Sequence, residues 1–118
     1  MKKDHDYIRE LLFGYEGAED WLLMMPGLTL DSTPEERRER YHVLLMIDSG
    51  FATEVGRGTF RITNSGHDYL EAIRDEGIWS KTKAAVAETG GSATLEIFKS
   101  LAMGFLRSKI EKHTGIAM

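Results

Sequence analysis

Residues 33–62 combine a strongly marked helix start with an alternating run of residues, and few folds accommodate that order. The sequence Thr33-Pro34-Glu35-Glu36 offers an N-cap threonine, a proline at the first helical position and a glutamate three residues after the cap. Together these signals predict a helix that runs to about Asp48. Gly50 follows as a natural C-terminal stop.

A β-hairpin is expected directly after this helix. Residues 51–62 alternate between apolar and other side chains on both sides of Gly56-Arg57, which suits a two-residue turn with glycine first. Such a turn would place the apolar side chains on one face of the hairpin. The expected cross-strand pairs are Val55 with Gly58, Thr53 with Phe60, and Phe51 with Ile62.

Apolar residues at helical spacing predict further helices on both sides of this region. Residues 21–25 are also apolar, but the run is short, and it is either a strand or a buried helical turn. The expected helices are residues 4–17 with Asp4 or Asp6 as the cap, a helix that begins after a cap at Asn64 or Ser65, one from about Ile78 to Thr89, and one over about 93–112.

This order of elements predicts a mainly α fold with a small β-hairpin (α+β), specifically a winged helix-turn-helix-like domain with additional C-terminal helices. Residues 34–48 would be the recognition helix and residues 51–62 the wing. The segment 27–32 stands where a second helix usually lies, so that helix is either reduced to a turn or absent. The winged-helix-like domain is expected over residues 1–92.

Residues 93–118 are expected to hold an amphipathic helix that docks either on the same domain or on a dimer mate. A membrane-surface helix is the less favoured alternative, because the segment lacks Trp and Tyr anchors. No run in the chain approaches the ~20 apolar residues of a membrane-spanning helix, so no membrane partner is expected. The apolar stripe includes Leu95, Phe98, Leu101, Ala102, Phe105 and Leu106.

The charge balance argues against a strongly basic nucleic-acid-binding protein. The chain has 15 Lys and Arg against 19 Asp and Glu, a formal net charge of -4. Residues 1–32 carry three cations against seven carboxylates, whereas residues 80–118 carry six cations against three carboxylates. The chain has no cysteine, which excludes disulfides and Cys-based zinc sites. With no export signal either, we expect a cytoplasmic protein.

Five arginines are candidates for contact with double-stranded DNA. Arg37, Arg38 and Arg40 belong to the expected recognition helix, and Arg57 and Arg61 belong to the wing. A good DNA-binding protein makes ~6–10 phosphate contacts, so five arginines interleaved with glutamates predict weak binding at most. The alternative is a solvated helix face on which these arginines pair with neighbouring glutamates.

Other side chains show no recognisable catalytic or metal-ligand spacing. The four histidines are far apart, and we expect His42 to be a hydrogen-bonded core residue. The acidic residues near Glu71 fit a solvated helix face. No nucleophile elbow or phosphate-loop motif occurs. We therefore expect no enzyme activity, no bound metal and no cofactor.

The stretch from Arg61 to Asp75 and four shorter segments share a common pattern. Together they resemble a bacterial and prophage-associated family of unknown function, number 2513, whose members are regarded as winged-helix-like. The similarity is strongest from Arg61 to Asp75, where Thr63-Asn64-Ser65-Gly66-His67 stands in place of the family's usual Thr-Trp-x-Gly-His. It implies an uncharacterised winged-helix-like protein and transfers no catalytic or ligand-binding residue. The other similar segments are Met1–Arg9, Tyr41–Leu45, Ser49–Phe51 and Trp79–Lys83.

Two functions from different classes remain open. The first is a DNA-binding or regulatory protein of bacterial or prophage origin, with a dimer expected. The alternative is a protein–protein interaction module on a winged-helix scaffold without nucleic-acid binding. A continuous positive face across the helix and the wing would favour DNA, whereas a mixed or acidic face would favour a protein partner.

Overall fold

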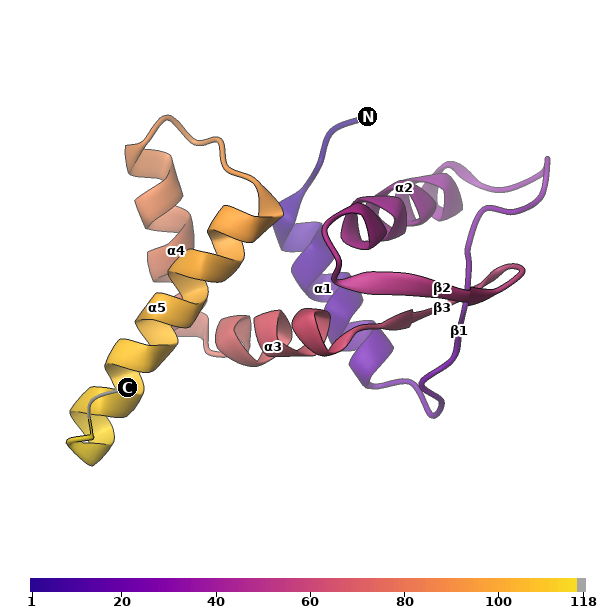
Figure 1. Cartoon of the computed structure of the whole chain (residues 1–118). Helices are drawn as coiled ribbons and strands as arrows, with labels where there is room; N and C mark the ends of the chain where they lie inside the picture. Colours follow the sequence, from indigo (N-terminus) through magenta and orange to yellow (C-terminus); the bar gives the residue numbers. More distant parts are fainter. Residues whose placement is uncertain (117–118) are drawn as a thin grey trace. The chain divides into compact units, whose positions relative to one another are not determined.

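The computed structural model describes residues 1–116. Within them, five helices and three short strands make the protein mainly α with a small antiparallel sheet (Figure 1), which confirms the expected fold class. The elements are α1 (His5–Glu16), β1 (Leu23–Met24), α2 (Pro34–Asp48), β2 (Ala52–Gly56), β3 (Thr59–Ile62), α3 (Asn64–Ile73), α4 (Glu76–Glu88) and α5 (Leu95–Thr114).

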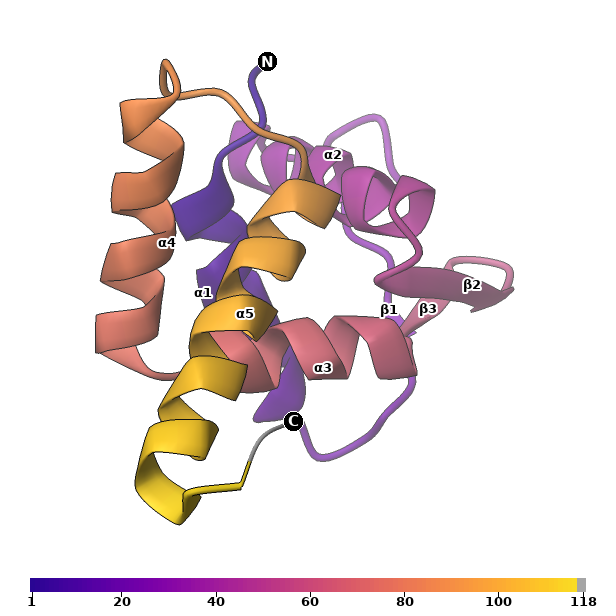
Figure 2. The ribbon, with the colours of Figure 1, turned by 60° about the vertical axis from the view of Figure 1, so that its left-hand side comes forward.

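The chain divides into two compact units. The first comprises Met1–His67 and the second begins at Asp68, so helix α3 crosses the division. The first unit contains α1, α2 and the three-stranded sheet. In the second unit α4 and α5 pack against each other, as Figure 2 shows.

Helices α1 and α2 begin where the local capping signals predict. The Asp4 side chain accepts a hydrogen bond from the Tyr7 N–H at the start of α1. At the start of α2, Thr33 and Glu36 form a reciprocal capping box, with hydrogen bonds of 3.1 and 3.2 Å. Residues 27–32 form a turn and no helix, which settles the two alternatives for that segment.

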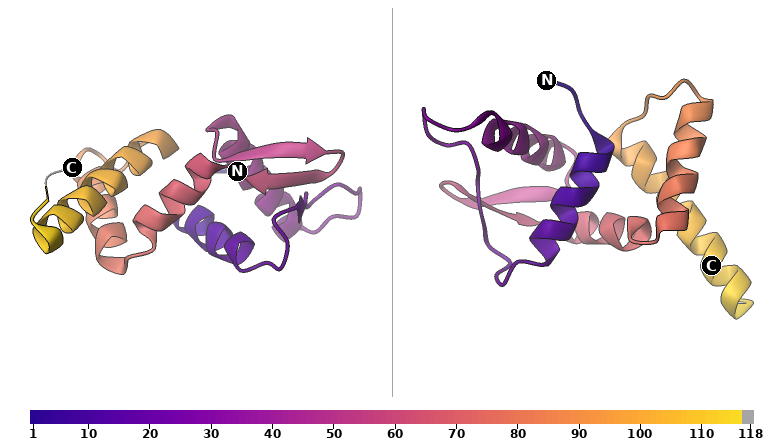
Figure 3. Two further views of the ribbon diagram at one scale, coloured as in Figure 1. Left: turned by 60° about the horizontal axis from the view of Figure 1, so that its bottom comes forward. Right: turned by 180° about the vertical axis from the view of Figure 1, so that it is seen from behind.

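The sheet has the strand order β1-β3-β2, and both pairs are antiparallel. The strand alternative for residues 21–25 is confirmed at Leu23–Met24, where Leu23 pairs with Phe60. The segment after β1 then passes the tip of the hairpin (Figure 3), where the Met25 N–H donates to the Gly58 carbonyl over 2.8 Å. A third strand therefore completes the expected hairpin.

The expected register of the hairpin is wrong by one residue. Ala52, not Phe51, pairs with Ile62, and the ladder shifts between Glu54 and Gly56, so that Val55 is the extra residue of a β-bulge. The turn consequently falls on Arg57-Gly58. Gly58 has φ +71°, a value that favours glycine. As a result Ala52 is buried and Val55 is exposed.

Both expected caps of α3, Asn64 and Ser65, are wrong, because Thr63 is the capping residue. Asn64 is already helical, and the Thr63 hydroxyl accepts from the Gly66 N–H over 3.2 Å. Gly66 lies against the start of the hairpin, where a β-carbon would come within 2.2 Å of the Phe51 carbonyl oxygen. This close approach explains why glycine occupies that position.

The second unit is held together by the apolar faces of α4 and α5. Leu95, Phe98 and Ala102 of α5 are buried, and the rings of Trp79 and Phe98 lie 5.7 Å apart. Docking of the C-terminal helix on its own chain is one of the two arrangements expected for it. Docking on a dimer mate stays a prediction. The remaining stripe residues Leu101, Phe105 and Leu106 are half-buried.

Candidate functional site

Arg38, one of the arginines expected on a DNA-binding face, is engaged within the protein. Its Nη2 forms an ion pair with Asp4 Oδ2 at 2.9 Å. Its guanidinium carbon lies 3.9 Å from the centre of the Tyr7 ring, within the range of a cation–π contact. Arg38 therefore links α2 to the start of α1.

Arg40 and Arg37 have different surroundings, although both belong to the same half of α2. Arg40 is half-buried along the turn at Gly27, and its Nη1 is buried without a hydrogen-bond partner within residues 1–116. Arg37 is exposed beside Met1, Ser32 and Pro34, which line a shallow hollow with it. Within residues 1–116, Arg37 is thus exposed without an ion pair, whereas Arg38 is paired with Asp4 and Arg40 is half-buried.

The hairpin carries the other two expected arginines. Arg57 is exposed at the turn. Arg61 is exposed on β3, and its Nη1 donates to the Ile62 carbonyl over 3.3 Å. The five arginines therefore differ in burial and in partners, and the expected DNA contact of each stays a prediction.

His42 is the fully buried, hydrogen-bonded histidine that the sequence predicts. The Asp4 N–H donates to His42 Nε2 over 3.0 Å, so the ring proton belongs on Nδ1, which lies 2.8 Å from the Arg38 carbonyl oxygen. The rings of Tyr7 and Tyr41 meet the imidazole edge-on. Both ring nitrogens are thereby committed to structure.

A second polar contact between α1 and α2 joins Tyr15 to Glu39. The Tyr15 hydroxyl donates to Glu39 Oε2 over 2.7 Å, and its ring packs edge-on against Phe60. Burial raises the pKa of Tyr15 above its ordinary value, and the hydrogen bond to the Glu39 carboxylate raises it further. The phenol therefore stays protonated and donates to the carboxylate.

An apolar strip, defined as the exposed side chains Trp21, Leu22, Met24, Leu28, Leu30 and Val55, follows β1 and reaches the hairpin. Trp21 is 66% exposed, Met24 is 75% exposed and Leu30 is fully exposed. The expectation of a short apolar element over 21–25 did not reveal this exposure. An edge strand of two residues is too short to bury an apolar run of this length. The shortness of the expected strand could therefore have indicated that part of the run is exposed.

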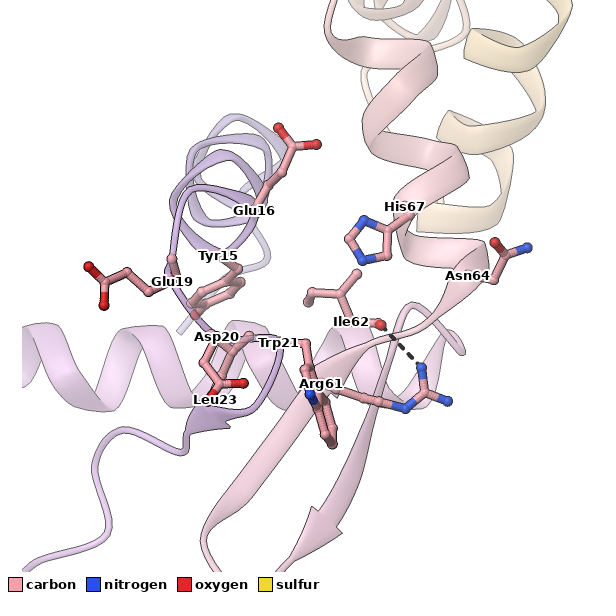
Figure 4. A pocket seen from close by; sticks show the side chains of 11 residues that line it. Tyr15, Glu16, Glu19, Asp20, Trp21, Leu23, Arg61, Ile62, Asn64 and His67 are labelled. Carbon is pink, nitrogen blue, oxygen red and sulfur yellow. Dashed lines mark hydrogen bonds between the residues drawn. The ribbon is translucent and has the colours of Figure 1, made fainter.

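A groove of about 560 Å³ lies next to Trp21. Figure 4 shows the acidic residues on the side of α1 and the loop after it, and Asn64 and His67 on the opposite side. The sequence did not predict this groove, because two stretches that are far apart in the sequence, residues 15–23 and 61–67, form it together. Its lining side chains include Tyr15, Glu16, Glu19, Asp20, Trp21, Leu23, Arg61, Ile62, Asn64 and His67.

Among residues 1–116, no three His, Asp or Glu side chains are close enough to share a metal ion. No helix of that part has the length and hydropathy needed to span a bilayer.

A family model described as "Hypothetical protein (DUF2513)" matches residues 2–92. No curated protein and no solved structure matches the chain. The matched residues make up most of the 118-residue sequence and include both helices and the sheet of the first unit. The chain therefore belongs to the DUF2513 family of hypothetical proteins.

Proposed function

We propose that this protein is a protein-interaction module built on a winged-helix scaffold. The strand order β1-β3-β2 supports the scaffold, because a winged helix pairs its short first strand with the second strand of the wing. The order α1, β1, α2, β2, β3 supports it too. Where a full helix usually follows the first strand, this chain has only the turn at residues 27–32.

The apolar strip is the observation that carries the proposed interaction. Five of its six side chains fall within ten consecutive residues, so they form a local concentration of exposed apolar surface. Concentrations of this kind mark interaction sites more often than isolated exposed leucines do. Met24 and Leu28 flank the hairpin turn, where Leu28 Cδ1 would lie 3.0 Å from a β-carbon at Gly58. A partner that covers the strip would thus contact both the loop and the hairpin.

Double-stranded DNA is the second candidate, and the charges support it less. Arg38 is neutralised by Asp4, and Arg40 is half-buried, which leaves Arg37, Arg57 and Arg61 to reach a phosphate. The lack of cysteine supports a cytoplasmic protein, and no enzymatic role is proposed for it. A homodimer stays a prediction.

The proposal is tested by selecting peptides from a random library displayed on phage against the immobilised chain. We expect enriched peptides that bind the wild type and lose most of their affinity for Met24→Ser/Leu28→Ser/Leu30→Ser. Ile97→Ser is the matched control, because Ile97 is 49% exposed on α5 and lies outside the strip. Circular dichroism checks that the variants stay folded. No enrichment, or equal binding to the triple variant, would overturn the proposal.

A further inference from the structure

We propose, on the basis of the interaction function above, that an extended segment of the partner pairs with strand β1 and adds a further strand to the sheet. In the order β1-β3-β2, β1 is an edge strand, because β3 is the only one of the described strands that pairs with it. Strand addition binds a peptide through main-chain hydrogen bonds, and the side chains beside the edge select its sequence. The apolar strip follows this same edge, since Leu22 and Met24 belong to it.

The backbone of Met24 faces the open side of the edge. The Met25 N–H donates to the Gly58 carbonyl over 2.8 Å, so the backbone of Met25 points toward the hairpin. Successive residues of an antiparallel ladder direct their N–H and C=O groups to opposite sides, so those of Met24 point away from β3. Within residues 1–116 these two groups have no hydrogen-bond partner, and Met24 is 75% exposed. Met24 therefore offers one donor and one acceptor to an added strand.

The opposite edge of the sheet is protected against strand addition, whereas β1 is not. Strand β2 carries Glu54 and the bulge at Val55, and both charged side chains and bulges keep edge strands from pairing with other chains. Strand β1 has neither a charged residue nor a bulge. Pro26 follows it without an N–H to donate, so the pairing would end there and the added strand would be short.

The side chains and the charge of this surface define the segment that fits. Leu22 and Met24 are two residues apart, so they lie on one face of the strand, and both are exposed. A segment with alternating apolar residues would place them beside this pair and extend the apolar strip. The first unit has eight Lys and Arg against twelve Asp and Glu, so it disfavours an acidic segment. The expected partner segment is extended, apolar at alternate positions and free of carboxylates.

The test is a titration of the ¹⁵N-labelled full chain with acetyl-Lys-Val-Thr-Val-Thr-Val-Lys-amide, followed by NMR. When about 90% of the chain is bound, the exchange of the Met24 N–H with solvent should slow about tenfold, because only the free fraction exchanges. The matched control peptide is acetyl-Lys-Val-Thr-Pro-Thr-Val-Lys-amide, whose central residue has no N–H to donate. This control should leave the exchange of the Met24 N–H unchanged.

Two variants of the chain separate backbone pairing from contact with the side chain. Met24→Ala shortens the side chain and keeps the N–H, whereas Met24→Pro removes the N–H as well. Proline is tolerated on an edge strand where the N–H faces solvent, and circular dichroism checks that both variants fold. Measured by the shift of the Trp21 indole N–H, Met24→Pro should bind the valine peptide about 2- to 10-fold more weakly than Met24→Ala.

The inference fails if the valine peptide leaves the Met24 exchange unchanged up to about 10 mM, where a complex of millimolar Kd would be mostly formed. It also fails if the proline peptide binds equally well, or if the two Met24 variants bind alike. Protection of the Met24 N–H that grows with protein concentration alone would overturn the assignment to a separate partner, because a second copy would then occupy the edge.

The proposed function can survive the failure of this inference. Phage-selected peptides that depend on the strip but bind Met24→Pro as tightly as Met24→Ala would leave the proposed function intact and remove only the pairing with β1.

Discussion

His42 has no exposed surface, and both of its ring nitrogens have hydrogen-bond partners within the protein. The imidazole connects the Asp4 N–H to the Arg38 carbonyl, so it holds the start of α1 against α2. In His42→Leu the Asp4 N–H would lose its acceptor, and an unsatisfied buried polar group costs about 1–3 kcal/mol. Urea unfolding should show that loss, whereas His113→Leu, at an exposed position of α5, should stay close to the wild type. Equal stabilities would show that the Asp4–His42 contact contributes nothing.

Two glycines should respond in opposite directions to replacement by alanine. At Gly66 a β-carbon would meet the Phe51 carbonyl oxygen at 2.2 Å, so Gly66→Ala forces the backbone apart and should cost at least about 1–3 kcal/mol. At Gly14, inside α1, no atom lies within 4 Å of the new carbon. Gly14→Ala should therefore stabilise the helix by roughly 0.5–1 kcal/mol. Thermal unfolding of both variants checks the pair, and a stable Gly66→Ala would contradict the close approach.

At the scale of elements, the hairpin turn provides a test of its register. With the turn at Arg57-Gly58, the strained position is Gly58, where φ is +71° and Leu28 lies close. Gly58→Ala should destabilise the protein by about 1–2 kcal/mol. Gly56→Ala should cost less, because its φ is ordinary and the nearest atom to a new β-carbon is 3.5 Å away. The opposite order in chemical denaturation would favour the register with the turn at Gly56-Arg57.

The packing of α1 on α2 predicts a loss of stability at alkaline pH. The pKa of Tyr15 is raised in the folded state by burial and by Glu39, so the folded protein holds this proton more tightly than the unfolded chain does. The resulting stabilisation is fully present below the unfolded pKa of about 10 and is lost as the pH rises further. Tyr15→Phe should be less stable at neutral pH by about 1–3 kcal/mol.

Urea unfolding between pH 8 and 11 checks this prediction. The wild type should lose stability more steeply than Tyr15→Phe above about pH 10, since only in the wild type does unfolding release the Tyr15 proton into solution. Parallel curves would mean that Tyr15 titrates alike in both states.

Features that depend on residues close together in the sequence were predicted, whereas features that depend on distant residues were not. The starts of α1 and α2 depend on residues at most three positions apart, such as Thr33 and Glu36, and they were predicted correctly. The hairpin register depends on Val55 bulging outward and on the approach of Leu28, 30 residues before Gly58. The groove is assembled from residues as distant as Tyr15 and His67. Neither the hairpin register nor the groove leaves a recognisable pattern among neighbouring residues of the sequence.

At the scale of the whole molecule, charge separates the two candidate functions. The first unit carries all five candidate arginines, yet its eight Lys and Arg face twelve Asp and Glu, whereas the charges of the second unit cancel. A DNA-binding surface would therefore have to work against the charge of its own unit. The apolar strip belongs to the same unit and offers a surface that does not depend on positive charge.

The small number of available arginines limits how steeply the affinity for DNA can depend on salt concentration. The affinity of duplex DNA falls with salt by a log–log slope of about -0.9 for each phosphate neutralised. Arg38 is exposed as well but is paired with Asp4, so with Arg37, Arg57 and Arg61 as the remaining candidates the slope should be no steeper than about -3. Fluorescence polarisation with a mixed-sequence duplex between 50 and 200 mM salt measures it, and Arg37→Glu/Arg57→Glu should remove whatever binding remains. A slope of about -6 or steeper would mean that many more cations reach the phosphates, and DNA would then replace a protein as the partner that this unit favours.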